Sequence, residues 1–255
     1  MRRRLLLGIF TAALALSGGA KASFADSKVL VVGTDVSFMP FEFSDNGKTQ
    51  GFDIDLWTKV ASDLGLQFKW QPMDFSGIIP ALQTKNIDLA ISGITITPAR
   101  AQVIDFSEPY YASGLTAVVA ENDKAITSPA DLAGKKIGVK TGTATVDWVK
   151  NNVKDAQMVS FPNIDDALLA LQAGRVDAVI HDTPNVIYYA NTAGKGLVRV
   201  LTPPMESGEY YGMAFPKGSP LIPQINAELS KLSANGFYKA TYIKWFGIAP
   251  TFEPK

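Results

Sequence analysis

Short β-branched runs alternate with longer amphipathic runs along most of this chain, and that alternation is typical of α/β layers. In a first series, the pattern predicts strands over residues 28–33 and 87–91. Helices are predicted over residues 52–66 and 78–84, because apolar residues recur there at helical spacing. One such series can build one sheet covered by helices, so the number of series predicts the number of lobes.

The same alternation starts again after residue 135 and predicts a second lobe of the same construction. A chain of 255 residues is long enough for two such lobes. Beyond the second series, the tail is predicted to be helical. The predicted elements of this part are strands over residues 136–140, 159–161 and 176–180, helices over 145–152, 165–173 and from 183 onward, and tail helices over 221–234 and 238–246.

Two crossings are expected to join the lobes, the first near residues 110–114 and the return near 206–210. Residues 26–110 and 210–255 would then form a discontinuous first lobe, and residues 111–209 the second lobe. The predicted fold class is therefore α/β, with two α/β lobes joined by two hinge strands.

The first 25 residues differ from the rest of the chain. A basic start, an apolar run over residues 5–16 that is too short to span a bilayer, and small residues after it predict a secretory signal peptide. Cleavage is expected after Ala25, with Ala22 as the alternative. This segment holds four of the 24 Lys and Arg residues and none of the 24 Asp and Glu residues, so the mature chain has a net charge of −4. That charge argues against a nucleic-acid partner, which needs a basic face.

The chain contains no cysteine, which excludes disulfides, thiolate zinc sites and a lipidated cysteine after the signal peptide. No later segment is apolar over a length that could span a membrane. We therefore expect a monomer that is free in the periplasm of a Gram-negative cell, is not membrane-anchored and carries no cofactor or metal.

The segment over residues 92–100 is the strongest functional signal. It follows a predicted strand, exposes backbone at Gly93, and then places Thr97 before a proline, which predicts a helix N-cap. The N–H groups of a helix N-terminus, the hydroxyl of Thr95 and the planar guanidinium of Arg100 suit a carboxylate. Taken alone, the segment fits a solvated Arg100 on the surface at least as well.

Polar residues follow four predicted strands, and ligands of α/β layers bind beyond such carboxyl ends. They are Asp35, the 93–100 segment, Lys140, and the pair of His181 and Asp182. Taken singly, each has a purely structural explanation. Asp35 could be a turn residue, Arg100 and Lys140 surface cations, His181 a half-buried ring and Asp182 a helix cap. All four predicted strand ends carry such groups, and they are divided between the lobes, so we expect one shared site.

The residue types indicate the ligand. Arg100 suits an α-carboxylate, and Asp182 with the carbonyl of Gly93 suits an α-ammonium group. For the side chain, Asp35 can only accept hydrogen bonds and Lys140 can only donate them. An amide needs one partner of each kind, which favours glutamine or asparagine over glutamate, lysine or arginine. The alternative is that Asp35 and Lys140 simply pair with each other.

Three longer segments, residues 73–86, 93–97 and 181–185, make the whole mature chain resemble the periplasmic glutamine-binding members of the amino-acid solute-binding family of ABC transporters. The resemblance implies the type II periplasmic binding protein fold, which closes around one amino acid, here L-glutamine. It also implies a membrane permease as the partner. It further implies that the ligand amide is held by Asp35, Lys140 and His181, and that its carboxylate is held by Arg100, Thr95 and a backbone N–H near Thr143 and Ala144. By the same resemblance, the ligand ammonium is held by Gly93, Thr95 and Asp182, and its aliphatic stem is enclosed by Phe38 and Phe75.

One position departs from the family pattern, because Ala144 stands where glycine usually follows the Lys-Thr-Gly-Thr run. The backbone N–H survives this change, but a methyl group approaches the ligand. Three other functions remain open: a binding protein for another polar amino acid such as glutamate, histidine or asparagine, a dehydratase-like enzyme on the same fold, or a sensor or envelope protein. We expect no enzyme, because neighbouring residues such as His181 and Asp182 rarely point at each other and no nucleophile elbow is present.

Overall fold

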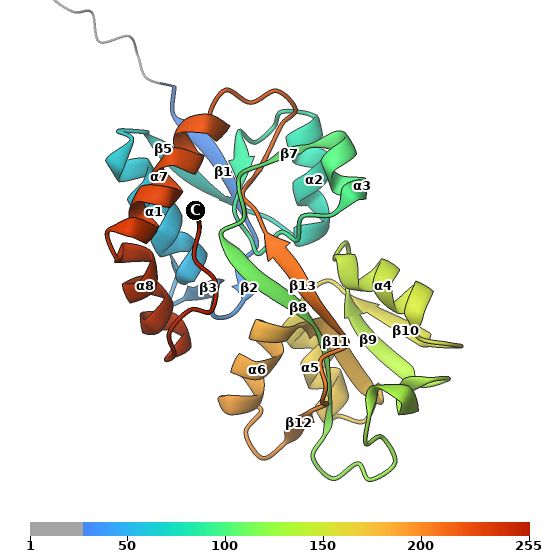
Figure 1. Ribbon diagram of the computed structural model, residues 1–255. Coiled ribbons are helices and arrows are strands. Elements are labelled where there is room, and N and C mark those ends of the chain that lie inside the picture. Colours follow the sequence, from blue (N-terminus) through green and yellow to red (C-terminus); the bar gives the residue numbers. More distant parts are fainter. Residues whose placement is uncertain (1–27) are drawn as a thin grey trace, which may run out of the picture.

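Two β-sheets organise residues 28–255, which are those that the computed structural model describes (Figure 1). The expected signal peptide lies outside the described residues. In the first sheet, the first strand of the chain, β1 (Leu30–Thr34), pairs parallel with both neighbours, so their carboxyl ends lie at one edge. Its strand order is β5 (Phe68–Pro72), β1 (Leu30–Thr34), β6 (Leu89–Ala90), β14 (Ala214–Phe215) and β7 (Asp105–Phe106).

Helices cover both faces of this sheet because β1 is apolar on both sides. Val32 packs into the cluster that includes the N-terminal helix and the two tail helices, and Val31 packs against the cluster on the other face. The helices of this lobe are α1 (Phe52–Asp63), α2 (Phe75–Gln83), α3 (Pro98–Val103), α7 (Ile222–Ala234) and α8 (Phe237–Phe246). A separate small antiparallel sheet is formed by β2 (Ser37–Phe38), β3 (Glu42–Asp45) and β4 (Lys48–Gln50).

The second sheet lies in the other lobe, which occupies the lower half of Figure 1. Two apolar clusters, one on each face, hold its helices in place. The strand order is β10 (Gln157–Phe161), β9 (Lys136–Lys140), β11 (Ala178–Asp182), β8 (Tyr111–Ala120) and β12 (Val198–Val200). A further strand, β13 (Glu206–Tyr211), also pairs with β8. The helices of this lobe are η1 (Pro129–Leu132), α4 (Ala144–Asn152), α5 (Ile164–Gln172) and α6 (Thr183–Asn191).

The two lobes are joined by β8 and β13, which run side by side between them (Figure 1). The first residues of β8 pair only with β13, and its later residues belong to the second sheet, where they pair with β11 and β12. The tail helices α7 and α8 pack with α1 in the first lobe. The expected fold class is therefore confirmed, while the expected boundaries at residues 110 and 210 stay a prediction.

Several elements differ from their predicted limits. Helix α2 begins at Phe75, three residues before the predicted start, so Phe75 opens a helix. The strand β5 and the sheet β2–β4 were not predicted. Their apolar residues are few, and β5 is an edge strand in which only Phe68 and Trp70 pack on the core. Among the described residues, no helix has the length and apolar character that crossing a membrane requires.

Candidate functional site

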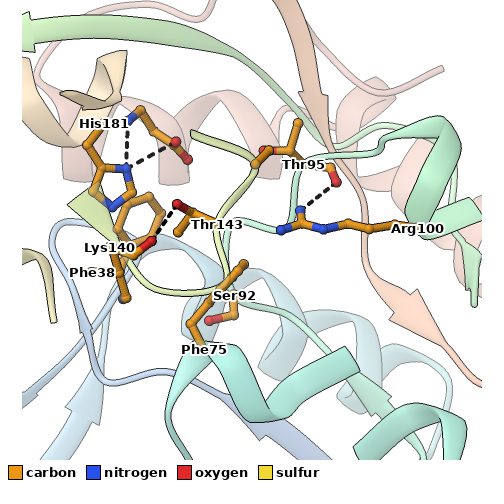
Figure 2. Close-up of a pocket in the computed structure, with 11 residues that line it drawn as sticks. Phe38, Phe75, Ser92, Thr95, Arg100, Lys140, Thr143 and His181 are labelled. Carbon is orange, nitrogen blue, oxygen red and sulfur yellow. Dashed lines mark hydrogen bonds and ion pairs between the residues drawn. The ribbon is translucent and has the colours of Figure 1, made fainter. Parts of the chain in front are cut away.

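A cavity lies between the lobes, at the ends of strands from both sheets (Figure 2). Ten of the eleven residues predicted from the sequence line it, and Asp35 is the one that does not. Ser92, the first residue of the predicted segment 92–100, also lines the cavity but was not among those eleven. The lining residues are Phe38, Phe75, Ser92, Gly93, Thr95 and Arg100 from the first lobe and Lys140, Thr143, Ala144, His181 and Asp182 from the second.

The segment between β6 and α3 places Arg100 in this cavity. Thr97 caps α3, because its hydroxyl accepts a hydrogen bond from the backbone N–H of Arg100 at 3.2 Å. The guanidinium donates to the carbonyl of Thr95 at 2.8 Å and to the carbonyl of Gly142, in the other lobe, at 3.1 Å. Burial lowers the pKa of Arg100, and nearby carboxylates, Asp182 first, oppose that shift. Arg100 is therefore held at the cavity and is not a freely solvated cation.

Gly93 is required by the backbone at the first-lobe side of the cavity. Its φ of +52° lies in the left-handed region, and an added Cβ would lie 2.3 Å from Cε1 of Phe38. Phe38 also stacks on the ring of His181, with centroids 5.4 Å apart, and thereby contacts the second lobe. The close approach of Gly93 and Phe38 leaves no room for a side chain at position 93.

Lys140 and Asp35 form an ion pair across the lobes, with Nζ and Oδ2 2.5 Å apart. Both side chains are almost fully buried, at 2% and 4% exposure. The other oxygen of Asp35 accepts the backbone N–H of Ser37 at 2.8 Å. Lys140 Nζ lies 5.8 Å and 5.6 Å from the ring centroids of Phe38 and Phe75. The alternative that Asp35 and Lys140 pair with each other is therefore present in the structure, and it places Asp35 behind the lining.

His181 and Asp182 end β11 and contact each other. The Nδ1 atom of His181 accepts the backbone N–H of Asp182 at 2.7 Å and lies 3.1 Å from its Oδ1. The expectation that neighbouring side chains point apart is thus wrong here, at the end of β11, where Asp182 is the last residue before α6. With Nδ1 as an acceptor, a neutral ring carries its proton on Nε2, which is buried and has no partner within the described residues.

Asp182 does not act as the helix cap that it resembles in the sequence. Its side chain makes no capping hydrogen bond to α6. Instead, Oδ2 accepts the hydroxyl of Tyr211, from β13, at 2.5 Å. Asp182 is only 6% exposed at the cavity, and its carboxylate is anchored by the strand that joins the lobes.

The remaining lining residues come from helix starts. Phe75 begins α2, and the guanidinium carbon of Arg100 lies 5.4 Å from its ring centroid. Ala144 begins α4, while the hydroxyl of the preceding Thr143 donates to the carbonyl of Lys140 at 2.8 Å. Figure 2 shows Arg100 pointing inward from one side and Phe38, Lys140 and His181 grouped at the other.

Glu209 is a charged residue near the site that sequence reasoning missed. It lies on β13, and one of its carboxylate oxygens is buried and has no partner in the described part of the chain. Burial and the carboxylates of Asp182 and Glu206 raise the pKa of Glu209 to about 7, and Arg100 opposes this shift. In the sequence, the mixed polar and aromatic run 206–211 resembles an exposed strand, so only the fold brings Glu209 toward Arg100.

The lining combines two cations, Arg100 and Lys140, with the carboxylate of Asp182 and aromatic rings, which suits a small zwitterion. Within residues 28–255, no group of three or more His, Cys, Asp or Glu side chains could hold a metal ion. Residues 30–248 match the family model for bacterial extracellular solute-binding proteins, family 3. The chain belongs to this family. The predicted resemblance to solute-binding proteins and the two-lobe fold are thereby confirmed.

Individual relatives cover nearly the whole chain. The L-arginine-binding protein of Pseudomonas aeruginosa is 34% identical, over 97% of this chain and 98% of that protein. The structure of the arginine-, lysine-, histidine-binding protein ArtJ of Geobacillus stearothermophilus superposes with a TM-score of 0.83 at 35% identity, covering 88% and 97% of the two chains. An ancestral arginine-binding protein bound to glutamine is similar with a TM-score of 0.80 at 42% identity, covering 86% and 98%.

Proposed function

We propose that this protein captures L-glutamine between its lobes in the periplasm and delivers it to the membrane permease of an ABC transporter. The observation that carries the proposal is Lys140 on the cavity lining, paired with the buried Asp35 behind it, in a cavity that Arg100 and Asp182 also line.

The end with Arg100 and Asp182 supports an α-amino acid as the ligand. The guanidinium matches a carboxylate in planar geometry, and the Asp182 carboxylate matches an ammonium group. Thr95 and the N-terminus of α4 at Ala144 add donors beside Arg100. Relatives named for binding arginine, lysine and histidine also favour this class of ligand.

The end with Lys140 supports a neutral polar side chain. An arginine or lysine side chain would place a second cation beside the buried Lys140, and a glutamate side chain would place a second carboxylate beside Asp35. Like charges in such a desolvated site cost several kcal/mol. An amide can donate to Asp35 and accept from Lys140 and from Nε2 of His181. Similar structures of an ancestral arginine-binding protein hold arginine in one case and glutamine in the other, so the choice of glutamine rests on the charges at the Lys140 end.

The deciding experiment is a thermal-shift and calorimetric comparison of glutamine, arginine, glutamate, histidine and asparagine. The protein is first unfolded in denaturant, dialysed and refolded, so that any ligand retained during purification is removed. A ligand that binds the folded state alone raises the unfolding temperature by mass action. Glutamine should give the largest shift with one site per chain. A larger shift with arginine would contradict the assignment of the Lys140 end.

The contact between His181 and Asp182 also favours testing a second function, because an imidazole 3.1 Å from a carboxylate is a possible acid–base pair. The same refolded sample can be incubated with cyclic hydroxy acids and followed by ultraviolet absorbance. We propose no turnover, because in this chain both groups are also bound by the Asp182 backbone and Tyr211. Water loss that is abolished by His181→Ala would instead support an enzyme.

A further inference from the structure

Two carboxyl groups lie beneath the segment that forms the first-lobe side of the cavity. Glu42, at the start of β3, and Asp53, in α1, are both fully buried. Each holds one cavity residue. The hydroxyl of Ser92 donates to Oε1 of Glu42 at 2.6 Å, and the backbone N–H of Gly93 donates to Oδ2 of Asp53 at 2.9 Å.

The two carboxyl groups are near enough for the charge of Asp53 to raise the pKa of Glu42. Oε2 of Glu42 and Oδ1 of Asp53 are buried and receive no hydrogen bond from any donor group in the described residues. Ionised carboxylates only accept hydrogen bonds, and two buried carboxylates repel each other, so a single proton on one of the two groups removes the repulsion and supplies a donor. Asp53 already accepts from Gly93 and from the hydroxyl of Tyr110, at 2.7 Å, which indicates that Asp53 carries the charge and Glu42 the proton.

We propose that Glu42 and Asp53 are positioning residues for the ligand, and that the one proton they share holds Ser92 and Gly93 in the arrangement that binds the α-ammonium group. This proposal depends on the proposed function in one respect, which is that the cavity binds an α-amino acid. It applies to any such ligand, because the ammonium group is common to all of them.

The surroundings explain why the position of Gly93 depends on this pair. Phe38 packs against Gly93 so closely that a small shift of the backbone would produce a clash. Ser92 also accepts the backbone N–H of Asp35 at 2.9 Å, so the pair is connected to the other end of the cavity as well. Tyr110, just before β8, ties Asp53 to the strand that leaves the lobe.

Loss of the shared proton would place two negative charges together in a dry interior. Burial raises the pKa of Glu42 well above its usual range and that of Asp53 to about 6. The charged groups that face the pair are Asp35, which favours the protonated form of Glu42, and Lys140, which opposes it. Since both pKa values are raised, both groups are protonated at low pH, Asp53 ionises first, and the single proton left on Glu42 is lost as the pH rises further. Ligand affinity should fall with it.

The test compares Glu42→Gln with Glu42→Ala and the wild type by calorimetry with glutamine between pH 6 and 9. Glutamine at position 42 can accept from Ser92 and donate to Asp53 without titrating, so this variant should bind within about twofold of wild type at pH 6. At pH 9 it should bind at least fivefold more tightly than wild type. Glu42→Ala should bind weakly at every pH.

Titration of the ligand ammonium affects all variants equally and cancels in the comparison at each pH. Glu121→Gln, at an exposed glutamate after β8, is the matched control and should follow the wild-type profile. Circular dichroism and thermal unfolding establish that each variant is folded. A Glu42→Gln profile parallel to wild type would overturn the proposal. If the protein binds arginine instead of glutamine, the same comparison is made with arginine, so the two proposals fail separately.

Discussion

Gly142 of the second lobe lies against Ser76 of the first, so closely that a Cβ on Gly142 would be 2.8 Å from the Cα of Ser76. The carbonyl of the same glycine accepts a hydrogen bond from Arg100 across the lobes. The side-chain amide of Asn185 likewise donates to the carbonyl of Met39 at 2.6 Å. These contacts belong to lobes that are closed around the cavity, so position 142 offers a direct test of closure.

Gly142→Ala should weaken glutamine binding by roughly tenfold, because overpacking of a close contact costs ~1–3 kcal/mol. The cost falls on the closed state only, so small-angle scattering with saturating glutamine should give a larger radius of gyration than for wild type. Gly196→Ala is the control, since Gly196 has a similar φ of +75° but no atom within 4 Å of the added Cβ. It should alter the unfolding temperature without altering affinity. Equal affinities of both variants would contradict a closed ligand-bound state.

Arg100→Ala should reduce glutamine affinity by ~2–5 kcal/mol, because it removes the charge partner of the ligand carboxylate from a partly buried site. Arg100→Lys keeps the charge but loses the planar fork that reaches Thr95 and Gly142, so it should recover only part of the affinity. Titration calorimetry measures both variants, with circular dichroism as the check on folding. Binding of Arg100→Ala within a few-fold of wild type would mean that this guanidinium is only a link between the lobes.

Asp35→Asn should narrow the preference for glutamine over glutamate. The substitution keeps the shape but removes the carboxylate that repels a glutamate side chain, and it frees Lys140 from its ion pair. Glutamine affinity should fall while glutamate affinity rises, as measured by competition at fixed pH and salt. Asp45→Asn, at an exposed carboxylate of β3, should leave the ratio unchanged. If the ratio is also unchanged in Asp35→Asn, the pair with Lys140 has a structural role only.

Glu209→Gln should flatten the pH dependence of stability. The pKa of Glu209 is raised to about 7 in the folded protein, above its ordinary value near 4.5. The folded state therefore binds a proton more tightly than the unfolded state, and the free energy of unfolding falls as the pH rises toward 7. Urea unfolding at pH 5, 6, 7 and 8 should show a steeper decline for wild type than for the variant. Parallel curves would show that Glu209 is solvated.

The elements that build the site could be predicted because their signals are local. Strand β9 has its predicted limits, and the cap formed by Thr97 and its following proline begins α3 as expected. Ends of parallel strands meet at one edge of a sheet, so polar residues after such strands identify a site before its geometry is known. Phe38, which the family resemblance implied as a residue that encloses the ligand stem, also lines the cavity.

Other parts of the site depend on partners that are remote in the sequence. Glu42 and Asp53 resemble ordinary surface acids of a turn and a helix, and only folding buries both of them beneath Gly93. Glu209 approaches Arg100 because β13 returns between the lobes. Neither relationship has a spacing or pattern that sequence reasoning could detect.

By itself, the sequence determined the α/β class, the two lobes and the set of strand ends that carry the polar residues, because hydrophobic period and helix caps act over a few neighbouring positions. Only the tertiary structure decided which of those groups touch each other. Asp35 and Lys140 lie 105 positions apart, and their ion pair exists because two separate sheets bring them to one cavity. Charge pairing, burial and the shared proton act through space, so they depend on the assembled lobes and not on the order of residues.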